Sequence, residues 1–316
     1  MEPTGPYKLE SLRTKPQIAE ALSAIEKTPQ LVTALLDEAF ANPKGIVTGI
    51  TGPPGAGKST LIEALIRQWR TEGLTVAVVA VDPSSKASGG ALLGDRVRMR
   101  TDPHDNGVFV RSVAARGRLG GLADIAFPAA ILLRALFDKV IVESVGVGQS
   151  ETDIAIVSDT VVLCIQPASG DSLQFMKAGI AEVPDIAVVT KADMGAAATR
   201  ALADLKGALS LAHRDPDGWE PECLSISITG ERNNLRQLFA AFGRHEAWLR
   251  SESRLENARD AKAKSWVESE IAAEFGRSGL DVIKQSLFRF SGKAPFTNSA
   301  RTLAAFEVLP KEPKEP

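Results

Sequence analysis

Short apolar runs alternate with amphipathic stretches along the chain from residue 45 to about residue 250. The runs are rich in Val and Ile, and the run at 74–81 is apolar almost throughout, which is typical of a strand covered on both faces. Strands that alternate with helices predict parallel βαβ units, and therefore an α/β fold with a doubly wound, mostly parallel sheet. The predicted strands are 45–51, 74–81, 108–113, 140–142, 160–166, 186–190 and 223–228.

Helical patterns flank this central region on both sides. Apolar residues recur at close to helical spacing through 15–40, and Pro29 predicts a division into two helices. After the last strand, 234–249 is amphipathic, and 251–285 is charged with a sparser apolar stripe. That stripe fits packing on the parent domain as well as a subunit interface, and the pattern favours neither.

These patterns divide the chain into three parts. We expect an N-terminal helical arm at 1–44, a central domain at 45–250, and a C-terminal helical extension at 251–316 that could serve as a dimerisation element. The end of the extension, 309–316, is rich in Pro and charge and is expected to be disordered. Within the central domain, 120–137 is a predicted helix that Pro128 should kink or break.

Composition excludes several broad classes. Lys and Arg number 37 against 39 Asp and Glu, which argues against a nucleic-acid binder that works through a wide basic surface. The two cysteines, Cys164 and Cys223, lie in apolar runs and are typical of core residues. No signal peptide or apolar stretch long enough for a membrane span is visible, so we expect a cytoplasmic protein without a membrane or nucleic-acid partner.

The first predicted strand is followed by Gly52-Pro53-Pro54-Gly55-Ala56-Gly57-Lys58-Ser59, which fits G-x-x-x-x-G-K-[ST] at every fixed position. An amphipathic helical pattern follows, and strand, glycine loop and helix are the arrangement of a P-loop. The backbone N–H groups and the helix N-terminus would surround phosphates, with Lys58 reaching the β- and γ-phosphates and the Ser59 hydroxyl ligating Mg²⁺. The sheet is therefore predicted to be that of a P-loop NTPase, with nucleotide contacts from Gly52, Gly55, Ala56, Gly57, Lys58 and Ser59.

A second motif indicates the base. Thr190-Lys191-Ala192-Asp193 ends a predicted strand and fits [NT]-K-x-D. The Asp193 carboxylate could accept hydrogen bonds from N1–H and the exocyclic amine of guanine, with the Lys191 stem over the base, and adenine offers neither donor there. Thr190 replaces the commoner Asn, so we expect the loss of an amide that braces neighbouring loops and a lower guanine affinity.

The segment after the last strand is a further candidate for the base. Guanine-binding folds place there a loop whose backbone N–H reaches the base O6, which here would be Ser227, Ile228 or Thr229. An ordinary turn between strand and helix is the alternative.

The run Val140 to Gly146 supplies candidates for catalysis. It is an apolar strand that ends in an acid and is followed by a glycine. Glu143 would hold Mg²⁺ through water, and the Gly146 N–H would contact the γ-phosphate, so Lys58, Glu143 and Gly146 are the catalytic candidates. Val147 follows where a Gln could orient the attacking water, so we expect slow intrinsic hydrolysis that a partner accelerates.

Two further acids lie near the predicted metal edge. Asp82 closes the second strand, and Asp95 lies in the glycine-rich 89–99 that follows. Both could approach Mg²⁺, although a solvated loop with ordinary ion pairs is the alternative.

Together, VDPSS (81–85), GGxxLGDxxRM (89–99), VESVGVGQSE (142–151) and TKAD (190–193) resemble the MeaB/ArgK-type GTPases. The resemblance implies a GTP-hydrolysing chaperone, commonly a homodimer, that gates adenosylcobalamin delivery to an acyl-CoA mutase such as methylmalonyl-CoA mutase and protects or reactivates it. It implies phosphate contacts from Gly55 to Thr60 and guanine contacts from Lys191 and Asp193. It implies a Mg²⁺ shell of Ser59, Asp82, Asp95 and Glu143, and a switch towards the mutase within 167–177 that includes Gly170, Asp171, Gln174 and Lys177.

Other functions remain alternatives. A metal-insertion GTPase of the nickel-delivery kind would need His- or Cys-rich ligands, and the chain has three scattered His and two Cys. A small-molecule kinase would need a catalytic base that the sequence does not identify. A scaffold that binds GDP passively would need no hydrolysis.

Overall fold

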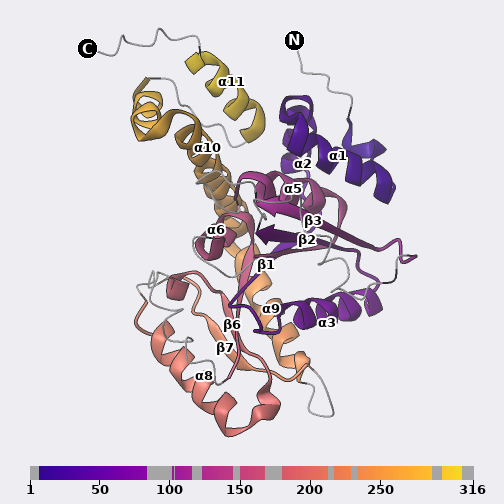
Figure 1. Ribbon diagram of the computed structural model, residues 1–316, viewed down its shortest axis with the longest axis vertical. Helices are drawn as coiled ribbons and strands as arrows, with labels where there is room; N and C mark the ends of the chain where they lie inside the picture. Colours follow the sequence, from indigo (N-terminus) through magenta and orange to yellow (C-terminus); the bar gives the residue numbers. More distant parts are fainter. Residues whose placement is uncertain are drawn as a thin grey trace.

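The computed structural model describes residues 7–83, 102, 104–115, 123–144, 150–167, 180–212, 217–228, 234–286 and 294–307. These residues form a seven-stranded sheet in the order β3-β2-β4-β1-β5-β6-β7, with every neighbouring pair parallel (Figure 1). The strands are β1 (Ile46–Thr51), β2 (Val76–Pro83), β3 (Val108–Ala115), β4 (Lys139–Glu143), β5 (Thr160–Ile165), β6 (Ile186–Val189) and β7 (Glu222–Ser225). The predicted α/β fold and each predicted strand are confirmed.

Helices cover both faces of the sheet, which makes it doubly wound. Successive strand residues point to opposite faces, so Val140 and Val142 contribute to one apolar cluster and Ile141 to another. The first face is covered by α5 (Ala123–Leu136), α6 (Ser150–Val157) and α8 (Ala196–Leu209). The opposite face is covered by α3 (Lys58–Thr71) and α9 (Leu235–Arg250).

Of the kink or break expected at Pro128, the break is not found in helix α5. The helix continues through this residue from Ala123 to Leu136 without a break. A proline inside a helix removes one N–H donor and crowds the preceding turn. Here Phe127 and Ile131 are buried in the core on either side of it, and that apolar packing favours the continuous helix.

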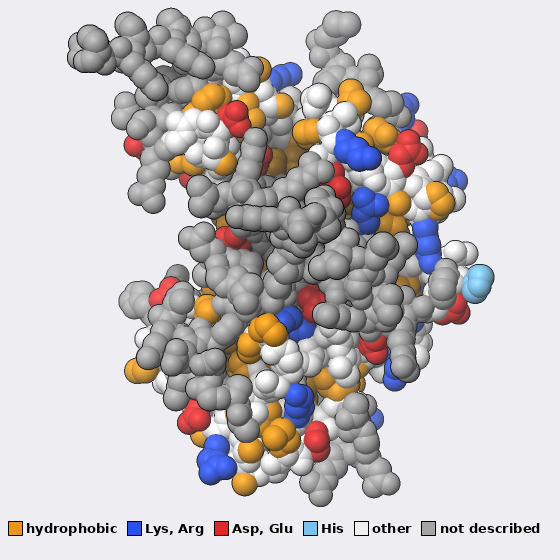
Figure 2. Space-filling model, viewed as in Figure 1, with side chains coloured by type: hydrophobic (Ala, Val, Ile, Leu, Met, Phe, Trp, Pro, Cys, Tyr) orange, Lys and Arg blue, Asp and Glu red, His pale blue; other side chains and the backbone are white. Residues whose placement is uncertain are grey.

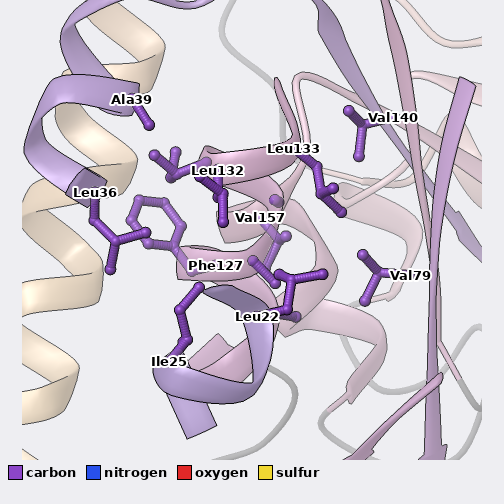
Figure 3. Close-up of a cluster of buried hydrophobic side chains, with 14 of the residues drawn as sticks. Leu22, Ile25, Leu36, Ala39, Val79, Phe127, Leu132, Leu133, Val140 and Val157 are labelled. Carbon is purple, nitrogen blue, oxygen red and sulfur yellow. The ribbon is translucent and has the colours of Figure 1, made fainter. Parts of the chain in front are cut away.

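The N-terminal segment packs on the outer side of α5. It contains the short η1 (Leu9–Ser11), then α1 (Lys15–Lys27), η2 (Pro29–Leu31) and α2 (Thr33–Ala41), so the predicted division at Pro29 is confirmed. Figure 3 shows side chains of α1 and α2 beside Phe127 and Leu132 of α5, with strand residues Val79 and Val140 beyond them.

The C-terminal extension returns to the N-terminal helices. Helix α10 (Arg254–Ser286), which follows η5 (Ser251–Ser253), bends at Gly276, where φ is 72°. Asp37 of α2 accepts hydrogen bonds from the N–H groups of Phe296 (2.9 Å) and Thr297 (3.0 Å) at the start of α11 (Pro295–Glu307). Arm and extension therefore lie at the same end of the molecule (Figure 1) and share apolar packing with α5, through rings such as Phe127 and Trp266, 5.2 Å apart. The three-part division remains a prediction, and the predicted tail at 309–316 lies outside the described residues.

The surface carries both signs of charge. On the face shown in Figure 2, Lys and Arg side chains are interspersed with Asp and Glu among the described residues. None of the helices in the described ranges is long and apolar enough to cross a membrane.

Candidate nucleotide site

The P-loop follows β1 at the carboxyl edge of the sheet. Gly52, Gly55 and Gly57 have φ values of 136°, 80° and 82°, which side-chain-bearing residues rarely adopt. A Cβ on Gly52 would lie 2.0 Å from the carbonyl oxygen of Cys164 in β5, so the loop passes directly over that neighbouring strand. Helix α3 begins at Lys58, and its N-terminus together with the loop amides forms a cradle of the kind that binds phosphate.

Lys58 is held within the loop. Its side chain is almost buried, and Nζ donates hydrogen bonds to the carbonyl oxygens of Gly52 (2.6 Å) and Pro53 (3.3 Å). The ammonium group therefore lies at the mouth of the cradle, where phosphate oxygens could take over as its acceptors.

The candidate metal donors Ser59 and Glu143 lie together. Ser59 Oγ donates a hydrogen bond to Glu143 Oε1 across 3.4 Å. This follows from the sheet, because β4 pairs with β1 in a register that sets Glu143 opposite Ile50, just before the P-loop. A hydroxyl and a carboxylate oxygen are the hard donors that Mg²⁺ prefers, so the donor set fits that ion. The backbone of Asp82 lies at the end of β2, close to the end of β4, whereas its side chain and Asp95 lie outside the described residues.

The turn after β6 contacts the P-loop directly. Thr190 is buried, and its Oγ1 lies 2.8 Å from the Ala56 carbonyl oxygen and 3.1 Å from that of Ile165. The structure differs here from the expectation that Thr190 leaves the neighbouring loops without a brace, because the hydroxyl supplies one. Lys191, at a φ of 55°, donates from Nζ to the Gly55 carbonyl oxygen (3.2 Å) and to Gln166 Oε1 (2.6 Å).

Asp193 is exposed in the short turn η4 (Ala192–Met194) and is held by residues that directly follow β7. Ser227 Oγ donates a hydrogen bond to Asp193 Oδ1 at 3.1 Å, and the Ala192 N–H donates to the Ile226 carbonyl oxygen at 3.0 Å. The Ser227 N–H donates to Asn234 Oδ1 at 2.9 Å. The contact to base O6 is therefore better assigned to Ile228 or Thr229 than to Ser227, and this remains a prediction.

Several predicted site residues cannot be placed. Gly146, Thr229 and the four switch residues Gly170, Asp171, Gln174 and Lys177 lie outside the described residues, as does Val147. Their roles remain predictions.

Sequence reasoning gave no role to Gln166, Asn234 or Ser144. Gln166 follows the β5 run and meets Lys191, and Ser144 follows Glu143 and donates to Thr51 Oγ1 at 2.8 Å. Their places at the carboxyl ends of predicted strands were the available signal. Asn234 directly precedes an amphipathic helix, a position that predicts only a helix cap.

Cys164, beneath the loop, takes no part in chemistry. Burial raises the pKa of its thiol to about 12; the nearby Lys58 charge opposes this shift and Glu143 adds to it. The thiol stays protonated and is a core residue, in agreement with the sequence-based interpretation.

A glycine cradle after the first strand of a parallel sheet, with a lysine at the helix start and an aspartate turn braced against the loop, defines a P-loop GTPase. The chain belongs to the MeaB family, since the family model described as methylmalonyl Co-A mutase-associated GTPase MeaB matches residues 18–277. The predicted resemblance is thereby confirmed, and the protein is a GTPase.

Individual relatives agree with this family. GTPase ArgK of Escherichia coli is 36% identical over 265 residues, which cover 81% of this chain and 80% of that one. The mitochondrial methylmalonic aciduria type A homolog of Mus musculus is 34% identical over 269 residues, which cover 79% of this chain and 64% of that one. Among solved structures, that of an LAO/AO transport system kinase has a TM-score of 0.65 and 27% identity, covering 95% of this chain and 96% of the other.

Proposed function

We propose that this GTPase is a chaperone of an adenosylcobalamin-dependent acyl-CoA mutase. In this role it gates delivery of the cofactor to the mutase and protects or reactivates the enzyme. The observation that carries the proposal is the match of residues 18–277 to a family described as mutase-associated. The name of the mouse relative refers to methylmalonic aciduria, and this supports an acyl-CoA mutase as the partner.

The nucleotide would be GTP or GDP, with Mg²⁺ between Ser59, Glu143, Asp82 and Asp95 to neutralise phosphate charge. Lys58 would stabilise the charge that develops on the phosphate oxygens, and the Gly146 N–H would sense the γ-phosphate. Asp193 and Lys191 would select guanine. With Val147 after Gly146, the chain supplies no glutamine there to orient water, so hydrolysis would be slow until the partner binds.

We further propose a cytoplasmic homodimer that retains the three-part division of the chain. The C-terminal extension is the candidate dimerisation element. The switch within 167–177 would report the nucleotide state to the mutase.

The test uses the purified full chain and a methylmalonyl-CoA mutase. GTP hydrolysis is measured with and without the mutase, and mutase inactivation during turnover is followed with and without GTP. We expect the mutase to accelerate hydrolysis and the GTPase to slow inactivation. The variant Lys58→Ala should lose both effects, whereas Lys206→Ala, on the exposed side of α8, should retain both.

Other outcomes would overturn the proposal. Absence of both effects at saturating mutase would remove the mutase as partner. Binding of Ni²⁺ or Zn²⁺ coupled to GTP would favour the metal-insertion alternative. Transfer of the γ-phosphate to an acceptor other than water would indicate a kinase, and protection that survives Lys58→Ala would indicate a passive scaffold.

A further inference from the structure

Asn234 occupies the position just before helix α9, with φ −120° and ψ 30°. Asn is favoured there because its side chain can accept a hydrogen bond from the first free N–H groups of the helix. The Asn234 side chain makes no such capping bond. A residue well suited to a cap therefore directs its amide elsewhere.

Both ends of the amide reach back to the end of β7. Asn234 Oδ1 accepts a hydrogen bond from the Ser227 N–H at 2.9 Å, and Nδ2 donates to the Ser225 carbonyl oxygen at 2.9 Å. The backbone adds a longer contact, from the Asn234 N–H to the Ser227 carbonyl oxygen at 3.4 Å. Asn234 therefore fixes the backbone at Ser225 and Ser227, which lie before residues 228–233 in the chain.

Ser227 passes this restraint to Asp193. The Ser227 side chain is buried, and its Oγ donates to Asp193 Oδ1 at 3.1 Å. The Asp193 turn is tied to the same segment by the hydrogen bond from the Ala192 N–H to the Ile226 carbonyl oxygen, 3.0 Å long. Both the backbone and the carboxylate of this exposed turn are therefore positioned by residues 225–227, and those residues are positioned by Asn234.

The orientation of the carboxylate matters for base recognition. A carboxylate accepts from N1–H and from the exocyclic amine of guanine at once only if both of its oxygens point at that edge and lie in the plane of the base. A rotation about the Asp193 side-chain torsions would leave at most one of the two bonds. A hydroxyl fixed in place reduces that freedom.

We propose that Asn234 is a positioning residue for guanine recognition, which acts through Ser227 to orient the Asp193 carboxylate. The inference rests on the proposed function in one respect, that Asp193 reads the base. Asn234 itself does not touch the nucleotide in this role.

The test compares the affinities of the full chain for GDP and IDP. Hypoxanthine keeps N1–H but lacks the exocyclic amine, so the ratio Kd(IDP)/Kd(GDP) reports the second hydrogen bond to Asp193. In Asn234→Ala we expect this ratio to fall by about tenfold, as for the loss of one hydrogen bond to a charged group. Asn234→Asp keeps the acceptor for the Ser227 N–H but sets a second oxygen against the Ser225 carbonyl oxygen, so it should restore only part of the ratio.

A double variant tests whether Asn234 acts through Ser227, and a further variant serves as the control. The double variant Ser227→Ala with Asn234→Ala should show no larger fall than Asn234→Ala alone, because residues in one chain of hydrogen bonds are not additive. The control is Asn42→Ala, which removes an amide donor to the Glu38 carbonyl oxygen (2.8 Å) at the end of α2 and should leave the ratio unchanged. Thermal unfolding of each variant shows whether it is folded.

The outcomes separate this inference from the proposed function. Equal losses of GDP and IDP affinity in Asn234→Ala, with the ratio preserved, would overturn the positioning role and leave a structural one. An unaltered ratio in Asn234→Ala with native affinity would overturn it as well. A wild-type chain that binds ADP as well as GDP would instead overturn guanine recognition, and the role of Asn234 with it.

Discussion

Thr190 Oγ1 donates a hydrogen bond to the carbonyl oxygen of Ala56, 2.8 Å away, and so joins the end of β6 to the P-loop. Its neighbour Lys191 reaches the Gly55 carbonyl oxygen in the same loop. The segment predicted to read the base therefore also restrains the loop predicted to hold the phosphates. A substitution in the segment that reads the base should therefore change the affinity of the P-loop for phosphate.

Replacing Thr190 with Val tests this hydrogen bond between Thr190 and the P-loop. Valine has nearly the shape of threonine but cannot donate, and it leaves a buried carbonyl oxygen without this partner, at a cost of about 1–3 kcal/mol. We expect the affinity for GDP, measured by titration with a fluorescent analogue, to weaken about tenfold. Thr190→Ser, which keeps the hydroxyl, should remain close to wild type.

Thr199→Val is a matched control, because the Thr199 hydroxyl donates to the carbonyl oxygen of Gly195, the residue just before α8, at 3.3 Å. It should leave GDP affinity unchanged. Equal affinities in Thr190→Val and wild type would show that the brace does not shape the phosphate site.

The strands and the P-loop were predictable because their signals are local. A strand covered on both faces must be apolar, as Val76 to Val81 is, and the P-loop requires glycines at fixed positions, which Gly52 and Gly57 occupy. Helix α8 has a local signal as well, in the spacing of its buried residues Ala198, Ala201, Leu205 and Leu209.

The strand order and the fine structure of the site were not predictable. Nothing near Ile46 indicates that β1 lies between β4 and β5, since that order depends on crossovers through distant segments. In the same way, Asn234 has the sequence signature of a helix cap, and only the fold brings Ser225 and Ser227 within its reach. The continuous helix at Pro128 shows tertiary packing overriding a local preference.

Replacing Gly52 with Ala should disrupt the P-loop. A Cβ would lie 2.0 Å from the Cys164 carbonyl oxygen, and the φ of 136° is unfavourable for alanine. Because the clash is with backbone, we expect loss of GDP binding and a free energy of unfolding lower by about 2 kcal/mol or more, measured by urea denaturation.

Gly207→Ala provides the control for that change. Gly207 lies in α8 with open space where a Cβ would be, so alanine should stabilise the protein by about 0.5–1 kcal/mol. GDP binding that survives in Gly52→Ala would contradict the close approach of the loop to β5.

The ion pair of Asp159 and Arg259 should anchor the C-terminal extension to the sheet. Asp159 accepts from Arg259 at 2.8 and 2.7 Å and from the Val47 N–H at 2.8 Å, and the pair is almost buried. Burial alone would raise the pKa of Asp159, but the Arg259 hydrogen bonds and nearby cations bring it below the ordinary value. Asp159→Asn leaves a buried guanidinium without its counter-charge and should lower the free energy of unfolding by about 3–5 kcal/mol.

The comparison for this variant is Glu252→Gln, which removes the partner of Arg254 in a pair whose carboxylate side chain is 76% exposed. Urea denaturation should show a change below about 1 kcal/mol for this exposed pair. Similar losses in the two variants would show that the Asp159 pair contributes no more than a surface contact.

His245 should make stability depend on pH. Its side chain is buried between the rings of Trp219 and Trp248, with centroids 4.7 and 5.7 Å away, and Nδ1 lies 2.9 Å from Thr160 Oγ1. Burial lowers the pKa of His245 below the ordinary 6.5, although the Asp185 carboxylate, 3.4 Å from Nε2, acts in the opposite direction. Burial has the larger effect, and the positive charge of Lys262 acts in the same direction as burial.

The direction of the effect follows from proton binding. As the pH falls, the unfolded chain binds a proton at this histidine at a higher pH than the folded chain does, because the folded pKa lies below 6.5. Stability is therefore retained above pH 6.5 and lost as the pH falls below it. We expect the free energy of unfolding, followed by tryptophan fluorescence in urea, to decrease between about pH 7.5 and about pH 5.5. His245→Gln should flatten this decrease, whereas His104→Gln, an exposed histidine, should retain the wild-type slope. The same slope in His245→Gln and wild type would show that the buried imidazole is not the source of the pH dependence.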